Sequence, residues 1–252
     1  MSETHSPVYR NVLVIGGTGG LGQAVALEFA QLAQTVHLTY HGRRAAAEKI
    51  GAAVAERGGT AEVHQLTLPD PDTRGTGIRK LLTRVTPCDV VVNCAVAGNP
   101  AVATVSNAEE FKSVIDANVF GAYQVNSISA QAMAGSGGGT VVNVSSVITR
   151  RYIVGAVGYV SSKAALEAMT RGFAREWGGA GVRFNTVSPG PIRDTRLLSM
   201  VPAQVIDGMM APGLEERLVS AQQVASVIRA VAGADFAAMN GEVVVVDEGF
   251  SL

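Results

Sequence analysis

The chain has little charge, few cysteines and no long apolar run. Only 16% of its 252 residues are charged, and Lys plus Arg (20) nearly balances Asp plus Glu (21), so no basic excess is available for binding nucleic acid. Two cysteines, Cys88 and Cys94, cannot form a disulfide framework and fit a reduced compartment. No apolar run approaches the ~20 residues that cross a bilayer, and residues 1–10 lack a signal-peptide pattern. We therefore expect a cytoplasmic protein with neither nucleic-acid nor membrane partners.

Two further kinds of site are missing from the sequence. There is no Gly-x-Ser-x-Gly segment, and the four histidines lie early in the chain, away from the later serine-containing strand, which argues against a nucleophilic hydrolase. The two cysteines do not stand at a metal-binding spacing from histidine. The sequence therefore predicts no metal ion.

Short apolar segments alternate regularly with longer segments of helical apolar spacing. This pattern predicts strands at 11–15, 35–39, 61–68, 89–93, 140–144, 182–187 and 242–246. It predicts helices at 23–33, 45–57, 73–85, 109–129, 161–177 and 221–231. We therefore expect a single α/β domain, a Rossmann-like doubly wound parallel sheet with helices on both faces and ligands at the carboxyl ends of the strands.

A glycine-rich turn, Gly16-Gly17-Thr18-Gly19-Gly20-Leu21-Gly22, stands between the first predicted strand and the first predicted helix. Glycine there lets the backbone approach a pyrophosphate closely, and the N–H groups and dipole of the following helix favour negative charge. A glycine cluster alone is weak evidence. Its strand–turn–helix context indicates a dinucleotide site.

The end of the second predicted strand indicates which dinucleotide binds. An acidic residue there would bind the adenosine ribose of NAD, but this chain has Tyr40-His41-Gly42-Arg43-Arg44. Two guanidiniums suit a 2′-phosphate, because their planar forked donors match its oxygens. We therefore expect NADPH/NADP rather than NADH. The alternative is that the two arginines form only a solvated basic turn.

Tyr159 and Lys163 stand four residues apart, which in a helix places a phenol and an ammonium on one face. An unperturbed tyrosine has a pKa of about 10, and a nearby cation favours the phenolate and lowers that pKa. The pair, with Ser146 upstream, is therefore a candidate for acid–base chemistry on one molecule. Taken alone, the pair could equally be a chance feature of an Ala-rich helix.

Five features, in this order along the chain, resemble the short-chain dehydrogenase/reductase family, in its NADPH-dependent 3-oxoacyl-[acyl-carrier-protein] and polyketide ketoreductase branch. They are the glycine-rich turn, Asn118, Ser146, Tyr159 with Lys163, and the segment Pro189-Gly190-Pro191-Ile192. The likeness extends from about Asn11 to Leu252. Ser146 is preferred to Ser145 because such reductases usually place the serine thirteen residues before the tyrosine.

The resemblance implies a role for each of four catalytic residues. Tyr159 donates a proton to the ketone oxygen as hydride arrives, and Ser146 hydrogen-bonds and orients that oxygen. Lys163 holds the nicotinamide ribose and lowers the pKa of Tyr159, and Asn118 helps to hold a water chain that returns protons. The implied cofactor contacts are Gly16, Thr18, Gly19, Gly20, Leu21, Gly22, Tyr40, Arg43, Arg44, Leu68, Asn93, Ala95, Tyr159, Lys163, Pro189, Gly190 and Ile192.

Several positions depart from the family pattern. Thr67 stands where an Asp usually contacts the adenine, and Cys94 and Val96 replace an asparagine and a glycine. Ile15 and Glu248 replace a common threonine and a common glycine. These departures bear on how the cofactor is held and leave the four catalytic residue types intact.

The substrate is predicted from the segment 195–218, which in this family covers the substrate. Its many apolar and methionine side chains favour a lipophilic acyl or polyketide chain, although they would serve equally to pack the segment onto the core. Residues 125–136 contain no basic residue of the kind that contacts a carrier protein, whereas Arg150 and Arg151 offer another anionic contact. The resemblance also implies a homotetramer, or a dimer, with the apolar strand 243–246 as one candidate contact.

Two other functions stay open. A reductase or dehydrogenase of a free small ketone, sugar or secondary alcohol would fit the missing basic helix. A non-catalytic dinucleotide-sensing protein would keep the fold and would be expected to lose part of the four-residue set, yet all four residue types are present.

Overall fold

The computed structural model describes residues 8–96, 108–152, 155–199 and 218–252. In these residues seven strands form one sheet in the order β3-β2-β1-β4-β5-β6-β7, and all neighbouring strands run parallel. The strands are β1 (Tyr9–Ile15), β2 (Ala33–Tyr40), β3 (Ala61–Gln65), β4 (Val90–Asn93), β5 (Gly139–Val144), β6 (Val182–Pro189) and β7 (Val243–Val246). The strand order reverses between β1 and β4, which opens a crevice at their carboxyl ends. The predicted doubly wound α/β fold is confirmed.

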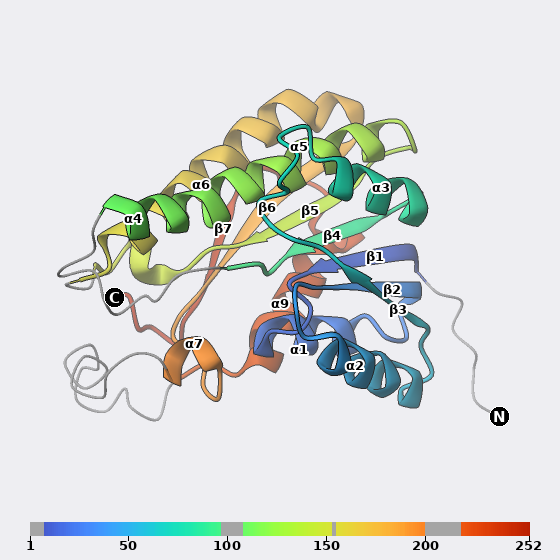
Figure 1. Ribbon diagram of the computed structural model, residues 1–252, viewed down its shortest axis with the longest axis horizontal. Helices are drawn as coiled ribbons and strands as arrows, with labels where there is room; N and C mark the ends of the chain where they lie inside the picture. Colours follow the sequence, from blue (N-terminus) through green and yellow to red (C-terminus); the bar gives the residue numbers. More distant parts are fainter. Residues whose placement is uncertain (1–7, 97–107, 153–154, 200–217) are drawn as a thin grey trace.

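Helices cover both faces of the sheet (Figure 1). One face carries α1 (Gly20–Glu28), α2 (Arg44–Glu56) and α9 (Ala221–Ala232), and the other carries α3 (Thr76–Val85), α5 (Gly121–Ala134) and α6 (Val157–Trp177). Two short helices, α4 (Ala108–Ile115) and α7 (Arg196–Ser199), lie near the carboxyl edge of the sheet. None of the described helices combines the length and apolarity needed to span a bilayer.

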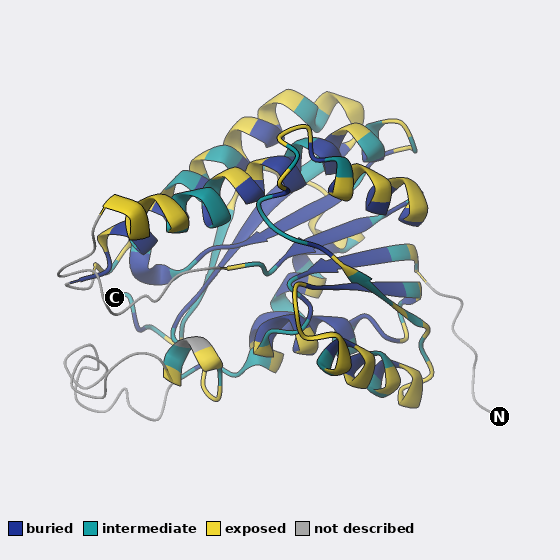
Figure 2. Ribbon diagram, viewed as in Figure 1, coloured by how far each residue is buried: buried dark blue, intermediate teal, exposed yellow. Residues whose placement is uncertain are grey.

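Successive side chains of β1 enter two separate cores. Val12 and Val14 pack in the cluster shared with α1 and α9, whereas Leu13 and Ile15 pack in the cluster shared with α3, α5 and α6. All four are at most 1% exposed, and Figure 2 shows the central strands as buried. Burying such a side chain stabilises the fold by about 1.5–3 kcal/mol relative to leaving it exposed. The strand ends that carry the glycine turn and Ser146 are therefore held on a rigid platform.

The predicted helix 109–129 is not one regular helix. α4 ends at Ile115, a π-helical turn spans Asp116–Phe120, and α5 then runs to Ala134. Asn118 lies in the π-helical turn and is only 3% exposed. Apolar periodicity cannot predict the inserted residue of a π turn, and such turns occur frequently at functional sites.

Three other helices and one strand have bounds that differ from the prediction by more than two residues. α3 begins at Thr76 rather than at residue 73, and β3 ends at Gln65 rather than at residue 68. α1 begins inside the glycine turn and ends five residues earlier than predicted, because β2 already begins at Ala33. α6 begins four residues earlier than predicted. As a result Tyr159 and Lys163 both lie in α6, as their spacing required.

Candidate active site

A cavity of about 680 Å³ lies at the carboxyl ends of the strands. Its walls come from the glycine turn after β1, the end of β2, the segments after β4 and β5, the first turns of α6, and the end of β6. All predicted cofactor residues except Arg44 and Asn93 line the cavity, and so do Ser146, Tyr159 and Lys163 of the predicted catalytic set. Cavities of this size hold small-molecule ligands.

Two glycines of the turn, Gly16 and Gly22, have no space for a side chain. Gly16 has a φ of +75°, and a Cβ there would lie 2.9 Å from the backbone nitrogen of Ala95. A Cβ on Gly22 would collide with the carbonyl oxygen of Gly16. The first helical N–H groups of α1 follow directly, and no side chain caps them. A close backbone cradle at an uncapped helix start fits a pyrophosphate.

Thr39 holds this turn in place, a role that the sequence analysis missed. Its hydroxyl accepts a hydrogen bond from the N–H of Gly16 at 2.9 Å, and its carbonyl oxygen accepts one from the N–H of Gly17 at 3.0 Å. The available signal was a polar residue near the carboxyl end of a predicted strand, directly before the segment assigned to the cofactor.

The two arginines after β2 are separated by the structure. Arg43 lines the cavity, and its Nη2 donates hydrogen bonds to the carbonyl oxygen of Thr18 at 2.8 Å and to its hydroxyl at 3.3 Å. Arg44 starts α2 and forms an ion pair with Glu48, with Nε and Oε1 2.8 Å apart. Only Arg43 therefore lies beside the glycine turn.

Asn93 lies beneath the cavity wall rather than in it. The side chain is 3% exposed, accepts a hydrogen bond from the N–H of Ala95 at 3.2 Å and donates one to Asn143 at 3.5 Å. It fixes the segment after β4, against which Gly16 packs. Its contribution to the site is to position Ala95.

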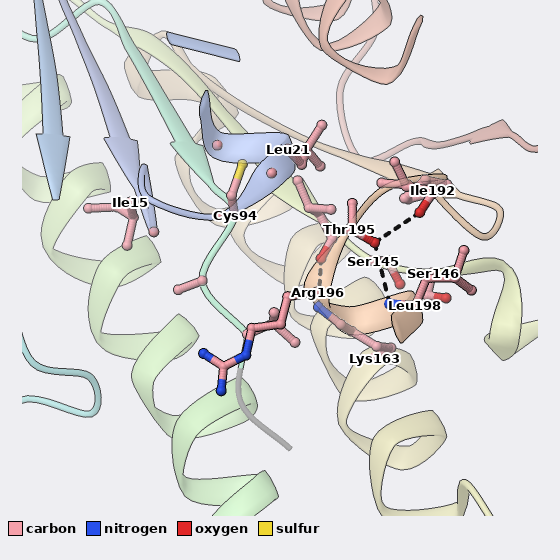
Figure 3. A pocket seen from close by; sticks show the side chains of 18 of the residues that line it. Ile15, Leu21, Cys94, Ser145, Ser146, Lys163, Ile192, Thr195, Arg196 and Leu198 are labelled. Atoms are coloured by element: carbon pink, nitrogen blue, oxygen red, sulfur yellow. Dashed lines mark hydrogen bonds between the residues drawn. The ribbon is translucent and has the colours of Figure 1, made fainter. Parts of the chain in front are cut away.

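The predicted catalytic residues Tyr159 and Lys163 project from α6 toward the end of β5. The Nζ of Lys163 donates a hydrogen bond to the carbonyl oxygen of Val144 at 2.8 Å and lies 5.7 Å from the centre of the Tyr159 ring. The hydroxyl of Ser146 hydrogen-bonds the Tyr159 phenol. Figure 3 shows Lys163 beside Ser145 and Ser146 at one side of the cavity, near Thr195 and Leu198. The three predicted residues thus meet at one point.

The direction of the pKa shift of Tyr159 differs from the expectation. Burial raises the pKa of Tyr159, and the hydrogen bond from Ser146 opposes that rise only in part. Burial also lowers the pKa of Lys163 to about 8, against the opposing influence of Cys94 and Glu167. The prediction that Lys163 lowers the tyrosine pKa does not hold here, because the cost of burying a phenolate dominates and the ammonium is turned to the carbonyl of Val144.

The structure distinguishes the two adjacent serines. The hydroxyl of Ser145 donates to the carboxylate of Glu167 at 2.7 Å, and Thr149 donates to the same oxygen at 3.0 Å. Ser146 instead contacts Tyr159 and accepts a 3.3 Å hydrogen bond from the N–H of Ile148. Ser146 therefore lies against the phenol, whereas Ser145 is paired with Glu167.

Asn118 lies behind the site and is not part of the cavity lining. Its Nδ2 donates to the hydroxyl of Ser162 at 3.2 Å, and Ser162 donates to the carbonyl oxygen of Tyr159 at 2.8 Å. Ser162 is another positioning residue that the sequence analysis missed, although it lies within the predicted Tyr-Val-Ser-Ser-Lys stretch. Through it, Asn118 braces the turn of α6 that carries the phenol.

Next to Ser146 the cavity wall is largely apolar. Val147, Ile148, Leu198 and Phe250 line it. Arg151 also lies there, and it donates a hydrogen bond to the carbonyl oxygen of Phe250 at 2.6 Å and stacks 4.9 Å from the centre of its ring. Phe250 was not predicted because it approaches from the far end of the chain.

The predicted substrate segment is described only at its ends. Thr195, Arg196 and Leu198 line the cavity, and residues 200–217 lie outside the described part of the chain. A parallel bridge joins Ile192 to Val219, and the side chain of Arg193 donates to the carbonyl oxygen of Leu218 at 2.9 Å. The two ends of the segment are therefore anchored side by side.

Comparisons relate the chain to known reductases and dehydrogenases. A family model described as enoyl-(acyl carrier protein) reductase matches residues 16–251. The chain is similar to a (3R)-3-hydroxyacyl-CoA dehydrogenase of Canis lupus familiaris, 31% identical over 249 residues that cover 94% of each chain. It is similar to an acetoacetyl-CoA reductase of Allochromatium vinosum, 28% identical over 236 residues that cover 92% of this chain and 94% of the relative. An acetoin dehydrogenase structure from Salmonella typhimurium matches with a TM-score of 0.82 and 25% identity, covering 96% of this chain and 97% of the other.

Proposed function

The chain belongs to the short-chain dehydrogenase/reductase family, and from this premise we propose that it is an NADPH-dependent ketoreductase that reduces the ketone of a 3-oxoacyl thioester or polyketide-type substrate. The family uses a nicotinamide dinucleotide and acts on hydroxyl or carbonyl groups. The observation that carries the proposal is a single cavity with Tyr159 and Ser146 at one end and Arg43 at the other.

The residues present fit such a cofactor. Gly16 and Gly22 cannot carry side chains, because a Cβ there would strike the protein backbone. A pyrophosphate can therefore approach the backbone of the turn closely. Arg43 presents a guanidinium beside Thr18 for a 2′-phosphate, and no carboxylate stands at the end of β2. Lys163 and Tyr159 line the cavity at the nicotinamide end.

The mechanism follows from where the protons are held. A reduced nicotinamide supplies hydride when bound. Tyr159 keeps its proton at neutral pH, because burial raises the pKa of the phenol, and it transfers that proton to the ketone oxygen. Ser146 hydrogen-bonds the phenol and orients the same oxygen. Lys163, whose ammonium donates to the carbonyl oxygen of Val144, would hold the nicotinamide ribose.

Cofactor preference can be tested with two neighbouring arginines. Arg43→Ala should weaken NADPH binding about 10–100-fold and NADH binding much less, because it removes charge-assisted hydrogen bonds to a phosphate. Arg44→Ala is the matched control, since Arg44 pairs with Glu48 on the surface of α2. Titration of each variant with both cofactors measures the effect. Equal losses of NADPH and NADH in Arg43→Ala would remove the basis for the NADPH preference.

The substrate class can be tested with a panel of ketones. Initial rates with NADPH are compared for acetoacetyl-CoA, a longer 3-oxoacyl thioester and the free ketones acetoin and diacetyl. We expect the highest kcat/KM for the thioesters, because the cavity wall next to Ser146 is lined by apolar side chains that an acyl chain can contact. Turnover of the free ketones alone would contradict the thioester proposal.

A second candidate is a reductase or dehydrogenase of a free small ketone or alcohol. Two observations favour it: the similarity to the acetoin dehydrogenase structure and the lack of a basic residue in 125–136 on α5. The same substrate panel decides between the two candidates, because a short hydroxyketone does not need the apolar wall next to Ser146.

We also propose that the chain assembles as a homotetramer. Tyr123 of α5 and Val157 of α6 are 51% and 67% exposed and offer apolar surface to a second copy of the chain. β7 ends the sheet and has one unpaired edge in the described residues. Light scattering coupled to gel filtration measures the mass, and a monomer at micromolar concentration would contradict this proposal.

A further inference from the structure

A cluster of three metal-ligating side chains lies outside the cavity, on β2 and β3. His37 of β2 stands opposite Glu62 of β3, and His64 stands opposite Thr39, so the three ligating side chains share one face of the sheet. The side chains of His37 and His64 are 5% and 10% exposed, and that of Glu62 is 46% exposed. β3 is the last strand of the described sheet on this side (Figure 1). The cluster therefore joins an edge strand to its neighbour and opens to solvent through Glu62.

The ligating atoms form a compact triangle. Nδ1 of His37 and Nε2 of His64 are 3.1 Å apart, and each lies 3.8 Å from the same oxygen, Oε2 of Glu62. A point equidistant from these three atoms lies about 2.1 Å from each. That distance matches the Zn–N and Zn–O distances of about 2.0–2.2 Å in proteins. An ion at this point lies in the plane of the three atoms, and moving it out of that plane toward a fourth ligand lengthens each distance only slightly.

The other ring nitrogen of His37 is held as metal-bound histidines require. Its Nε2 lies 2.9 Å from Oδ1 of Asn11, and Nδ2 of Asn11 donates to the carbonyl oxygen of Pro87 at 3.0 Å. Because that carbonyl can only accept, the amide oxygen of Asn11 faces the ring, and His37 donates through Nε2. Its Nδ1 lone pair therefore points into the triangle. An outer hydrogen bond that fixes the tautomer in this way is typical of histidine ligands.

We propose that His37, Glu62 and His64 bind one zinc ion, with water in the fourth position on the exposed side. Two neutral imidazoles and one carboxylate are a ligand set that zinc accepts, and a water completes the tetrahedron. The ion replaces the proton that His64 otherwise shares with His37. The prediction of no metal ion considered only spacing along the chain, which cannot reveal a cluster formed across two strands.

One neighbouring charge opposes the ion. Nη2 of Arg84, from α3, lies 3.7 Å from Oε2 of Glu62. The Arg84 side chain is 70% exposed, so it can leave the carboxylate when an ion arrives. The proposed role is structural: the ion ties β3 to β2, whose carboxyl end carries Tyr40 and His41 into the cavity wall.

Calorimetric titration of the untagged full-length chain with ZnCl2, after removal of metals by a chelator, tests the site. We expect one Zn²⁺ per chain with a Kd in the micromolar range or tighter, and no comparable binding of MgCl2, because magnesium prefers oxygen ligands. Glu62→Gln and His64→Gln should each weaken zinc binding at least tenfold. Arg84→Gln should strengthen it severalfold, since a competing cation is removed.

The other two histidines provide matched controls. His5→Gln and His41→Gln remove imidazoles elsewhere in the chain and should leave the zinc affinity unchanged. Circular dichroism confirms that each variant folds, and the visible absorption of Co²⁺ in place of zinc reports whether the site is tetrahedral. Wild-type protein that takes up no zinc, or Glu62→Gln and His64→Gln variants with wild-type affinity, would overturn the proposal and leave a hydrogen-bonded histidine pair.

Discussion

The two ends of the cavity are lined by different parts of the chain, one by backbone and the other by side chains. At the β1–β2 end the wall is mostly backbone, with glycines packed so closely that Gly16 has no room for a side chain. At the β5–α6 end the wall carries the functional groups of Ser146, Tyr159 and Lys163. The first end can therefore be damaged by adding a single carbon, and the second by removing a single oxygen.

The largest effect is expected at the side-chain end. Tyr159→Phe removes only the phenol oxygen and should lower kcat about 10²–10⁴-fold, because the ketone oxygen loses its proton donor. NADPH affinity should change little, since the glycine turn and Arg43 are untouched. Steady-state kinetics and cofactor titration measure the two separately. Wild-type turnover in a variant that still binds NADPH would falsify the assignment of the acid.

The adjacent serines give a second, smaller effect with an internal control. Ser146→Ala should lower kcat about 10²-fold, in the range seen when one donor to a reacting oxygen is removed. Ser145→Ala should leave kcat within tenfold and instead destabilise the fold by about 1 kcal/mol, because Glu167 loses one hydrogen-bond donor. Kinetics and denaturant unfolding of both variants check this, and reversed outcomes would transfer the catalytic role to Ser145.

The backbone end is tested by adding one carbon. Gly16→Ala should destabilise the fold by about 1–3 kcal/mol and weaken cofactor binding, because φ is +75° and the new Cβ would press on Ala95. Gly172→Ala in α6 is the control: no atom lies within 4 Å of its Cβ position, so it should stabilise by about 0.5–1 kcal/mol. Denaturant unfolding measures both. Similar stability for the two variants would show that the turn is not sterically closed.

The last effect is a change of stability with pH. The pKa of Lys163 is about 8 in the folded protein, below the ~10.4 of an exposed lysine in the unfolded chain. Between these values the unfolded chain binds more protons at this lysine, so the contribution of Lys163 to the stability of the cofactor-free protein should rise between pH 8 and 10, by on the order of 1–3 kcal/mol. Cys88 and Cys94 contribute the opposite slope in this range, because burial raises the pKa of each thiol to about 12. The difference in unfolding free energy between wild type and Lys163→Met, measured at each pH, isolates the lysine and should shift in favour of wild type from pH 8 to 10.

The sequence predicted what depends on periodicity and short spacing. The alternation of apolar segments predicted the seven strands, and the four-residue spacing of Tyr159 and Lys163 predicted their common helix face. It could not predict the π-helical turn around Asn118, because an inserted residue leaves no mark on apolar periodicity. Phe250 at the cavity and the His37–Glu62–His64 cluster were missed because strand pairing and the chain end bring them into place.

The electrostatics were the least predictable part of the site. The spacing of Tyr159 and Lys163 predicts that the two side chains lie close together. The direction of a pKa shift depends instead on how far burial strips water from the charged form of the group. Both side chains are less than 10% exposed, and that burial reverses the expected direction for the phenol. Arg43 and Arg44 give a similar lesson, since adjacent residues of one type face a cavity and a helix surface.

The bridge between Ile192 and Val219 makes the intervening segment an exchangeable module. Its two ends are pinned together by backbone pairing and by the contact of Arg193 with Leu218, outside the glycine turn and the Ser146–Tyr159 pair. Since the two ends already lie side by side, a change in the number of residues between them costs little, because closure entropy grows only with the logarithm of the length. We therefore expect that exchanging this segment between related reductases alters which ketones are accepted.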